Sequence, residues 1–169
     1  INKYNKSDFI LKRIVDYTVV LALFPMLIIT SIYVIIMKFL NGHEGNFIYT
    51  QLRHGKNQNA FSLYKLRTMH IDSDIQGNTK KNDQRIYSFA KILRRFRLDE
   101  LPQIINIIFG DMHLVGPRAE WVKLSDNYSK TIENYSLRNT VRPGITGWAQ
   151  VLYQYGFDIY DSKQKLMYE

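Results

Sequence analysis

The sequence predicts an α+β fold that is mainly helical. An uncharged apolar run, Tyr17–Met37, has the composition of one long helix. Two short runs rich in aromatic and β-branched residues, 47–53 and 61–67, flank a glycine-containing loop at 55–59 and predict a small β-hairpin. Apolar residues recur with helical spacing in 86–97. The chain has no internal repeat and no Pro-, Gly- or Ser-rich linker, so we expect a single domain.

Positive charge dominates the composition, because 23 lysines and arginines against 15 acidic residues give a net charge of +8. Such a balance calls for an anionic partner: nucleic acid, an anionic membrane surface or a phosphorylated substrate. The absence of cysteine excludes disulfides, cysteine-based zinc sites and cysteine nucleophiles. The 4 histidines lack the spacing of metal ligands, so we expect structural or surface roles for them.

The Tyr17–Met37 run is long enough to span a bilayer, which takes about 20 helical residues. Pro25 lies inside it, where it removes one backbone hydrogen bond and bends a helix. Lys12 and Arg13 precede the run and Lys38 follows it, so the flanking charges give no clear orientation. Two interpretations are equal at this point: a segment that bends at Pro25 and leaves on the face where it entered, and a spanning helix with a proline kink.

The second predicted strand carries two cations on one face. Lys65 and Arg67 alternate to the same side, where they can clamp a phosphate, although solvated strand charges are the commoner explanation. Residues 72–84 are polar and predict a surface loop, the best candidate in the chain for a mobile lid.

An amphipathic helix is predicted over residues 86–97. Its apolar stripe consists of Ile86, Phe89, Ala90, Leu93 and Phe96, and its basic residues lie off that stripe. Such a helix can lie in a membrane interface with its aromatic side chains in the lipid. A helix packed on the protein core has much the same pattern, so the pattern alone does not choose between the two.

Three arginines surround two adjacent carboxylates in residues 94–103, and an apolar run follows. The pattern predicts a helix with Asp99 near its start, Pro102 in its first turn and Gly110 as its C-terminal stop. A helix start favours an ionised carboxylate. Asp99 can therefore be a nucleophile or a metal ligand acting on a phosphate substrate. It can also be a plain helix cap with salt bridges, and caps are far commoner than active sites.

These features leave three classes of function. Arginine forks, a carboxylate-bound divalent cation and a carboxylate nucleophile together suit catalysis at a phosphate. A nucleic-acid-binding protein would share the net charge, but it has no need of the Tyr17–Met37 run, which argues against it. A membrane-anchored interaction module without chemistry would leave Asp99 and Glu100 as a cap.

The chain also carries several short motifs. In order, they are Lys12-Arg13-x-x-Asp16, Gln51-x-Arg53-x-Gly55, Tyr64-Lys65-x-Arg67-Thr68-Met69, Leu98-Asp99-Glu100-Leu101-Pro102-Gln103, Gly110-Asp111-Met112, Val115-Gly116-Pro117-Arg118 and Arg142-Pro143-Gly144-Ile145-Thr146-Gly147-Trp148-Ala149-Gln150-Val151. Together they resemble the bacterial sugar transferase family, the monotopic phosphoglycosyl transferases, over residues 10–169. The resemblance is closest to the exopolysaccharide and undecaprenyl-phosphate sugar phosphotransferases.

The resemblance implies a transferase that moves a sugar-1-phosphate from a UDP-sugar to a polyprenyl phosphate such as undecaprenyl phosphate. This step begins glycoconjugate or exopolysaccharide biosynthesis. By analogy, Asp99 is the nucleophile that forms a covalent aspartyl-phosphosugar intermediate, and Glu100 assists by positioning groups or in proton transfer. Mg²⁺ is expected beside Asp99.

The basic positions of the family have counterparts here as well. Arg94 and Arg118 match positions that meet phosphate or nucleotide, and Lys65, Arg67 and Arg142 match further substrate-binding positions. The implied partners are the UDP-sugar, the polyprenyl phosphate and a lipid membrane, with no nucleic acid, and a homo-oligomer is left open.

In the family the membrane segment is a re-entrant helix broken at a proline, here Pro25, so the resemblance favours the same-face interpretation. It implies one membrane-associated catalytic domain over residues 1–169, with the re-entrant helix in 10–40. The catalytic part in 41–169 would lie on the cytoplasmic face of the bacterial inner membrane, held there by interfacial amphipathic helices. Because the family continues with more helix, we expect a catalytic core truncated at its C-terminus.

The chain departs from the family pattern at two positions. A small hydroxyl residue usually precedes the helix-breaking proline, and here Phe24 cannot satisfy the backbone groups that a break frees. The family usually reads Pro-Arg-Pro around Arg118, and here Ala119 replaces the second proline, so we expect a less rigid loop. The Tyr153–Phe157 stretch is closest to the exopolysaccharide branch.

Overall fold

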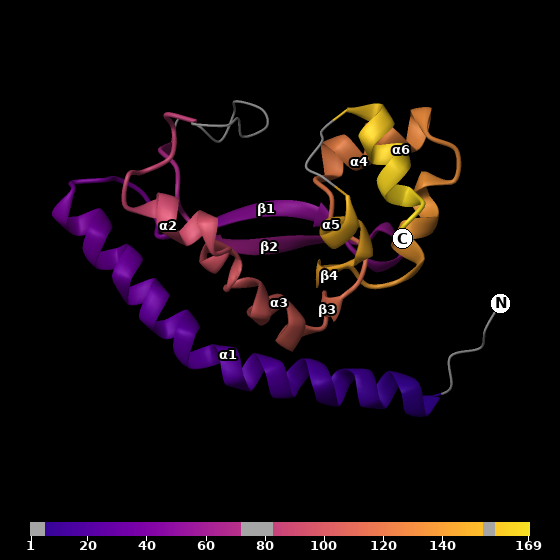
Figure 1. The fold of residues 1–169 in the computed structure, drawn as a ribbon, viewed down its shortest axis with the longest axis horizontal. Coiled ribbons are helices and arrows are strands. Elements are labelled where there is room, and N and C mark those ends of the chain that lie inside the picture. Colours follow the sequence, from indigo (N-terminus) through magenta and orange to yellow (C-terminus); the bar gives the residue numbers. More distant parts are fainter. Residues whose placement is uncertain (1–5, 72–82, 154–157) are drawn as a thin grey trace.

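The computed structural model describes residues 6–71, 83–153 and 158–169 (Figure 1). The helices are α1 (Lys6–Leu40), α2 (Ala90–Arg95), α3 (Gln103–Phe109), α4 (Val122–Thr131), α5 (Trp148–Leu152) and α6 (Ile159–Leu166). The strands are β1 (Ile48–His54), β2 (Ala60–Leu66), β3 (His113–Val115) and β4 (Gly144–Thr146), and the 3₁₀ turns are η1 (Lys56–Gln58), η3 (Leu98–Glu100) and η4 (Tyr135–Thr140). The fold is α+β and mainly helical, as predicted. The predicted loop of residues 72–84 and the Tyr153–Phe157 stretch fall largely outside the described residues.

Strands β1 and β2 form the predicted hairpin and pair in antiparallel fashion, with Ile48 opposite Leu66. Side chains alternate between the two faces of the hairpin, so Leu63 and Lys65 share one face and Leu66 lies on the other. In the same register Arg53 of β1 lies opposite Phe61, on the face that carries Lys65. The hairpin therefore presents two cations on a single face.

Helix α1 contains Pro25 and bends near its middle (Figure 1). Proline has no N–H to donate to the preceding turn, which weakens the helix there. The Thr30 hydroxyl donates to the carbonyl oxygens of Met26 at 2.8 Å and Leu27 at 3.1 Å, and such back-bonding also bends helices. Within the described residues, Phe9–Leu40 is the one helix long and apolar enough to cross a membrane.

Both arms of α1 pack against the remainder of the fold. The main core cluster, which includes the first arm, consists of Val20, Leu27, Leu63, Ile104, Ile107, Met112 and Ala119. In the second arm Val34 is fully buried against Leu66 of the hairpin and Leu93 of α2. One face of helix α1 thus packs on the folded core in both arms, so removing the helix would expose core residues of α3 and of the hairpin.

Polar contacts fix the first arm of α1 to β3. The buried Asp16 carboxylate accepts hydrogen bonds from Nδ1 of His113 at 2.5 Å and from the backbone N–H of Leu114 at 3.1 Å. The Lys12 ammonium donates to the carbonyl oxygen of Val115 at 3.1 Å. These bonds set the register of α1 along β3.

Strands β3 and β4 pair in parallel and hold the turn that carries Arg118. The N–H of Gly144 donates to the Pro117 carbonyl at 2.8 Å, and the N–H of Gly116 donates to the Thr146 carbonyl at 2.9 Å. A Cβ atom at Gly144 would lie 2.1 Å from the Gly116 nitrogen, so only glycine fits there. The turn is therefore tied closely to β4.

Helix α2 is shorter than the sequence predicts, because it begins at Ala90 instead of near residue 86. Ile86 pairs with Met69 in an isolated antiparallel bridge, which holds this backbone in an extended conformation. Ala90 and Leu93 of the predicted stripe are buried, but Phe96 lies beyond the end of the helix and is 61% exposed. The stripe therefore packs on the core at its centre only.

The buried His113–Asp16 pair predicts a pH dependence of stability. Burial lowers the pKa of His113 below its ordinary value of 6.5, against the opposing pull of the Asp16 carboxylate. The unfolded chain then takes up a proton near pH 6.5, whereas the folded chain does so only at lower pH. This contribution to stability is complete above about pH 6.5 and is lost as the pH falls toward the folded pKa.

The temperature at the midpoint of thermal unfolding in detergent should accordingly decrease when the pH is lowered from 7 to 5. His113→Asn keeps a donor near the position of Nδ1 but cannot titrate, so its midpoint should fall less over the same range. An equal fall in both proteins would contradict this account of the pair.

Candidate active site

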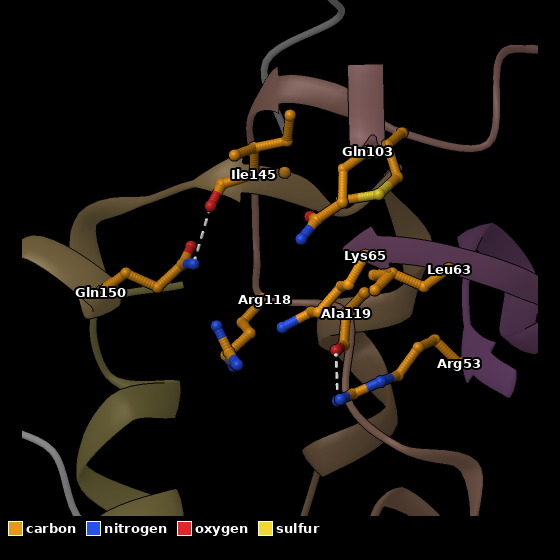
Figure 2. Close-up of a pocket in the computed structure, with 10 residues that line it drawn as sticks. Arg53, Leu63, Lys65, Gln103, Arg118, Ala119, Ile145 and Gln150 are labelled. Atoms are coloured by element: carbon orange, nitrogen blue, oxygen red, sulfur yellow. Dashed lines mark hydrogen bonds between the residues drawn. The ribbon is translucent and has the colours of Figure 1, made fainter. Parts of the chain in front are cut away.

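Three segments that are distant in the sequence converge at one pocket: the end of β2, the start of α3, and the turn after β3. Figure 2 shows Lys65, Gln103 and Arg118 pointing toward a common space from these segments. Gln150 closes the pocket from the side of α5, and its amide donates to the Ile145 carbonyl at 2.9 Å. Three cationic residues, Arg53, Lys65 and Arg118, thus line one small hollow beside the start of α3.

An ion pair between Lys65 and Glu100 joins the hairpin to η3. The Lys65 ammonium lies 2.8 Å from Oε1 of Glu100, and the two side chains are 20% and 12% exposed. Burial alone would raise the pKa of Glu100, but the charges of Lys65 and Arg118 outweigh it and lower the pKa to about 2. Glu100 is therefore a permanent anion at neutral pH and a weak base, so its geometry suits the positioning of Lys65 better than proton transfer.

Asp99 lies in η3 with only 7% of its surface exposed. Burial raises the pKa of Asp99 and the adjacent Glu100 charge adds to the rise, while Lys65 and Arg94 oppose it. A carboxylate of raised pKa is more basic, and therefore more nucleophilic, than an ordinary aspartate. Among the described residues Asp99 forms no ion pair within 4 Å, so no salt-bridge partner neutralises its carboxylate.

The prediction that Asp99 caps the following helix is wrong. Helix α3 begins at Gln103, its N-cap position is Pro102, and no side chain caps it. Arg97 has a left-handed backbone with φ of 58°, an unusual conformation for a residue with a side chain, and it separates α2 from the turn that carries Asp99. The predicted C-terminal stop is confirmed, because Gly110 is left-handed with φ of 87°.

Two of the predicted arginines belong to this cluster. Arg94 donates from Nη1 to the Thr68 hydroxyl at 3.1 Å, and its charge acts on Asp99. Arg118 lies with Nε 3.6 Å from Oε1 of Glu120, and its charge acts on Glu100. The two guanidinium groups thus approach the two catalytic candidates from α2 and from the turn after β3.

The structure places the other two predicted cations in different surroundings. Arg67 donates from Nε to the Asn46 carbonyl at 3.1 Å, and its guanidinium lies 5.5 Å from the centre of the Tyr49 ring, where the hairpin joins α1. The guanidinium of Arg142 lies 5.6 Å from the centre of the Phe9 ring in the first arm of α1. A role in substrate binding stays a prediction for both.

Sequence reasoning missed Arg53 as a member of the site. Its Nη1 donates to the Ala119 carbonyl at 3.0 Å (Figure 2). Its guanidinium also lies 3.9 Å from Oε2 of Glu120. Arg53 therefore holds the residue after Arg118 and shares Glu120 with it. The motif Gln51-x-Arg53-x-Gly55 was the available signal, although it did not indicate which group the arginine would contact.

Asn106 was missed as well, and it fixes the hairpin against α3. This fully buried side chain accepts from the Tyr64 N–H at 3.2 Å and donates to the Ser62 carbonyl at 2.8 Å and to Asp111 Oδ2 at 3.2 Å. A single polar residue inside the apolar run before Gly110 was the only signal in the sequence. Through Asn106, the strand that carries Lys65 is aligned with the helix that follows Asp99.

Within the described residues, no group of three or more histidines, aspartates or glutamates is arranged to hold a metal ion. Mg²⁺ does not need such a group, because it often binds through one or two carboxylates together with substrate phosphates. The buried Asp99 carboxylate, which no cation neutralises by direct contact, fits that type of ligand. Glu100 fits less well because Lys65 already occupies one of its oxygens.

Comparison with known proteins agrees with this geometry. The family model described as bacterial sugar transferase matches residues 7–169, and the chain belongs to that family. The UDP-glucose:undecaprenyl-phosphate glucose-1-phosphate transferase of Xanthomonas campestris pv. campestris is 46% identical over 111 residues, 63% of this chain and 23% of that protein. The UDP-N-acetylgalactosamine-undecaprenyl-phosphate N-acetylgalactosaminephosphotransferase of Aeromonas hydrophila is 39% identical over 127 residues, 74% of this chain and 30% of that protein.

A shorter relative is matched over most of its length. The exopolysaccharide production protein PSS of Rhizobium leguminosarum bv. phaseoli is 36% identical over 154 residues, 85% of this chain and 74% of that protein. The chain therefore spans less than a third of the two transferases named above but most of this relative.

The Lys65–Glu100 pair predicts a strong energetic coupling. Lys65→Met should lower the free energy of unfolding by about 3 kcal/mol, because it leaves the Glu100 charge buried without its partner. Adding Glu100→Gln removes that charge, so the double variant should be more stable than Lys65→Met alone. Denaturant unfolding of the wild type, both single variants and the double variant measures the coupling. Simple additivity of the two losses would contradict the pairing.

Proposed function

We propose that this chain transfers a sugar-1-phosphate from a UDP-sugar to undecaprenyl phosphate or a related polyprenyl phosphate. The observation that carries the proposal is the buried Asp99 carboxylate, which forms no ion pair with the described residues, lies under the charges of Lys65 and Arg94, and neighbours Glu100, on which Arg118 acts. A diphosphate needs cations to bind it and a nucleophile to attack it, and this cluster supplies both. The named transferase relatives use UDP-sugars and undecaprenyl phosphate, in keeping with this chemistry.

In the first step a carboxylate oxygen of Asp99 attacks the phosphorus atom that carries the sugar. The bond from this phosphorus to the oxygen that bridges it to the nucleoside phosphate breaks, and UMP leaves with the bonding electron pair. The product on the protein is an acyl phosphate, an aspartyl-phosphosugar. Arg94 and Arg118 offset the charge that develops on the equatorial phosphate oxygens.

In the second step an oxygen of the polyprenyl phosphate attacks the same phosphorus, and the Asp99 carboxylate is released as the leaving group. The lipid then carries a diphosphate-linked sugar. Glu100 holds Lys65 beside the reacting phosphate in both steps and remains ionised throughout, consistent with its low pKa. Splitting the transfer in this way lets one carboxylate serve two substrates in turn.

Mg²⁺ belongs to the same proposal. One oxygen of Asp99, together with donor phosphate oxygens, would hold the ion, which neutralises charge on the diphosphate.

The contacts of α1 support a membrane arrangement in which both arms lie on one side. Lys12 and Asp16 of the first arm bind β3, and Val34 of the second arm is buried against Leu66 of the hairpin and Leu93 of α2. A straight spanning helix would place these two ends on opposite sides of the bilayer, and one body could not contact both. We therefore propose that α1, which is bent as Figure 1 shows, enters and leaves the membrane on the side of the active site, and we assign that side to the cytoplasmic face of the inner membrane.

Large apolar side chains at the surface support the same placement. Much of α1 is exposed, with Leu21 at 76% and Phe39 at 85%, although such residues are normally buried. Phe96 after α2 and Phe109 of α3 are 61% and 69% exposed. Insertion of α1, with α2 and α3 at the lipid interface, would cover this surface and bring Asp99 to the level of a lipid phosphate.

Replacing the nucleophile tests the reaction. Asp99→Asn should reduce UMP release from a UDP-sugar, in the presence of Mg²⁺ and undecaprenyl phosphate, by at least about a thousandfold. Asp126→Asn is a matched control, because Asp126 pairs with His54 at 2.9 Å outside the site, and this variant should retain the wild-type rate. An Asp99→Asn variant as active as the wild type would overturn the assignment. No UMP release by the wild type across a panel of UDP-sugars would favour a non-catalytic membrane module.

Cysteine labelling tests the topology. Single cysteines at Lys6 and at Asn41, the two ends of α1, should react with an impermeant maleimide from the same side of sealed membrane vesicles. Labelling from opposite sides would show a spanning helix and contradict the same-side arrangement.

A further inference from the structure

A second buried ion pair lies directly behind Arg118. Arg138 of η4 donates from Nη2 to Oε1 of Glu169 at 2.6 Å, and the two side chains are only 5% and 4% exposed. Arg138 also donates from Nη1 to the Tyr135 hydroxyl, and its guanidinium lies over that ring with Cζ 4.9 Å from the centre. The pair joins η4 to the end of the segment that follows α6.

This ion pair holds both backbone polar groups of Arg118. Arg138 donates from Nη2 to the Arg118 carbonyl at 3.0 Å, and Oε1 of Glu169 accepts from the Arg118 N–H at 3.4 Å. The peptide groups on both sides of one Cα atom are thus bonded to two side chains that are bonded to each other. Arg118 also pairs with Gly144 of β4 in an isolated parallel bridge, in which the Gly144 N–H donates to the Pro117 carbonyl. The strand and the ion pair therefore hold this Cα atom together, and the ion pair alone bonds both backbone polar groups of Arg118 through side chains.

Core stability does not account for such an arrangement. Burying two charges costs desolvation energy that their attraction repays only in part, and apolar residues in their place are often as stable or more so. The cost is higher here because Nε of Arg138 is buried and has no hydrogen-bond partner in the described part of the chain. The Arg138–Glu169 pair is better explained by its contacts with the backbone of Arg118, which fix the position of that residue.

We infer that the Arg138–Glu169 pair positions Arg118 so that its guanidinium meets the phosphate of the sugar-nucleotide donor. The inference rests on the proposed function and adds two positioning residues that touch no substrate themselves. Nε of Arg118 lies 3.6 Å from Oε1 of Glu120, and its side chain lines the pocket (Figure 2). The guanidinium meets a phosphate accurately when the Cα atom is fixed, since a displacement of about 1 Å can cost a hundredfold in rate.

Two readouts on Glu169→Gln test the inference. The change keeps the size of the side chain but removes the charge that holds Arg138 and the Arg118 N–H. Amide hydrogen exchange should become faster in the peptide covering residues 116–119, with the helices unchanged. The KM for a UDP-sugar should rise about tenfold because donor binding is weakened, and kcat should fall as well because Arg118 also offsets charge in the transition state.

A double-mutant cycle shows whether the effect passes through Arg118. In an Arg118→Ala background Glu169→Gln should not raise KM further, and independent effects would overturn the inference. Arg138→Lys keeps the charge, but a single ammonium cannot reproduce the guanidinium fork. It should therefore raise KM like Glu169→Gln.

A matched control separates positioning from general destabilisation. Asp83→Asn breaks a different ion pair, in which Arg85 lies 2.6 Å from Asp83. It should lower the unfolding midpoint without changing KM or exchange at residues 116–119.

Unchanged exchange in Glu169→Gln would overturn the positioning role, and faster exchange with an unchanged KM would overturn its link to the donor. If the wild type turned over no UDP-sugar, the proposed function would fail, and exchange would still decide whether the pair holds Arg118.

Discussion

The ion pair between Lys65 and Glu100 is the constraint on which the site depends. It joins a strand to a turn 35 residues away in the sequence and leaves Asp99, the adjacent residue, without an ion-pair partner in the part of the chain that the structure describes. If Lys65 paired with Asp99 instead, the nucleophile would be neutralised and its pKa lowered. Glu100 thus pairs with the nearby lysine, and Asp99 remains reactive. The different contacts of these two neighbouring carboxylates give them their different roles.

The remaining contacts keep that pair in register. Asn106 bonds the edge of β2 to α3, and the close approach of Gly116 and Gly144 holds the turn that carries Arg118. Helix α1 also supports the site, because Val20 and Leu27 pack in the same core cluster as the buried side chains of α3. The segment assigned to the membrane therefore also supports the active site, and a change in its bend would reach Asp99 through α3.

Local features of the structure were predictable from the sequence because neighbouring residues determine them. The hairpin followed from its aromatic and β-branched runs, and the end of α3 from Gly110. The beginning of α2 was not predictable, because Ile86 is drawn into a bridge with Met69, a contact that the helical pattern does not encode. Asp99 was wrongly expected to cap a helix, because the left-handed Arg97 and the 3₁₀ turn after it cannot be recognised from residue types.

The site itself was only partly predictable. The family motifs indicated Asp99, Glu100, Lys65, Arg94 and Arg118, and the structure brings these residues together. The residues that hold them in place were not predicted, because Arg53, Asn106 and the Arg138–Glu169 pair contact residues that are distant in the sequence. A sequence alone gives no measure of which distant polar residues will meet. Such positioning contacts therefore appear only once the fold is known.

The central claim is that Asp99 becomes covalently attached to the sugar phosphate, and mass spectrometry of the protein tests it most directly. The protein would be mixed with a UDP-sugar and Mg²⁺ without any lipid acceptor, quenched and digested. We predict a mass increase of one sugar phosphate on the peptide that contains Asp99, released when undecaprenyl phosphate is added. UMP formation that requires the acceptor, with no modified peptide in its absence, would show direct transfer between the substrates and contradict the account.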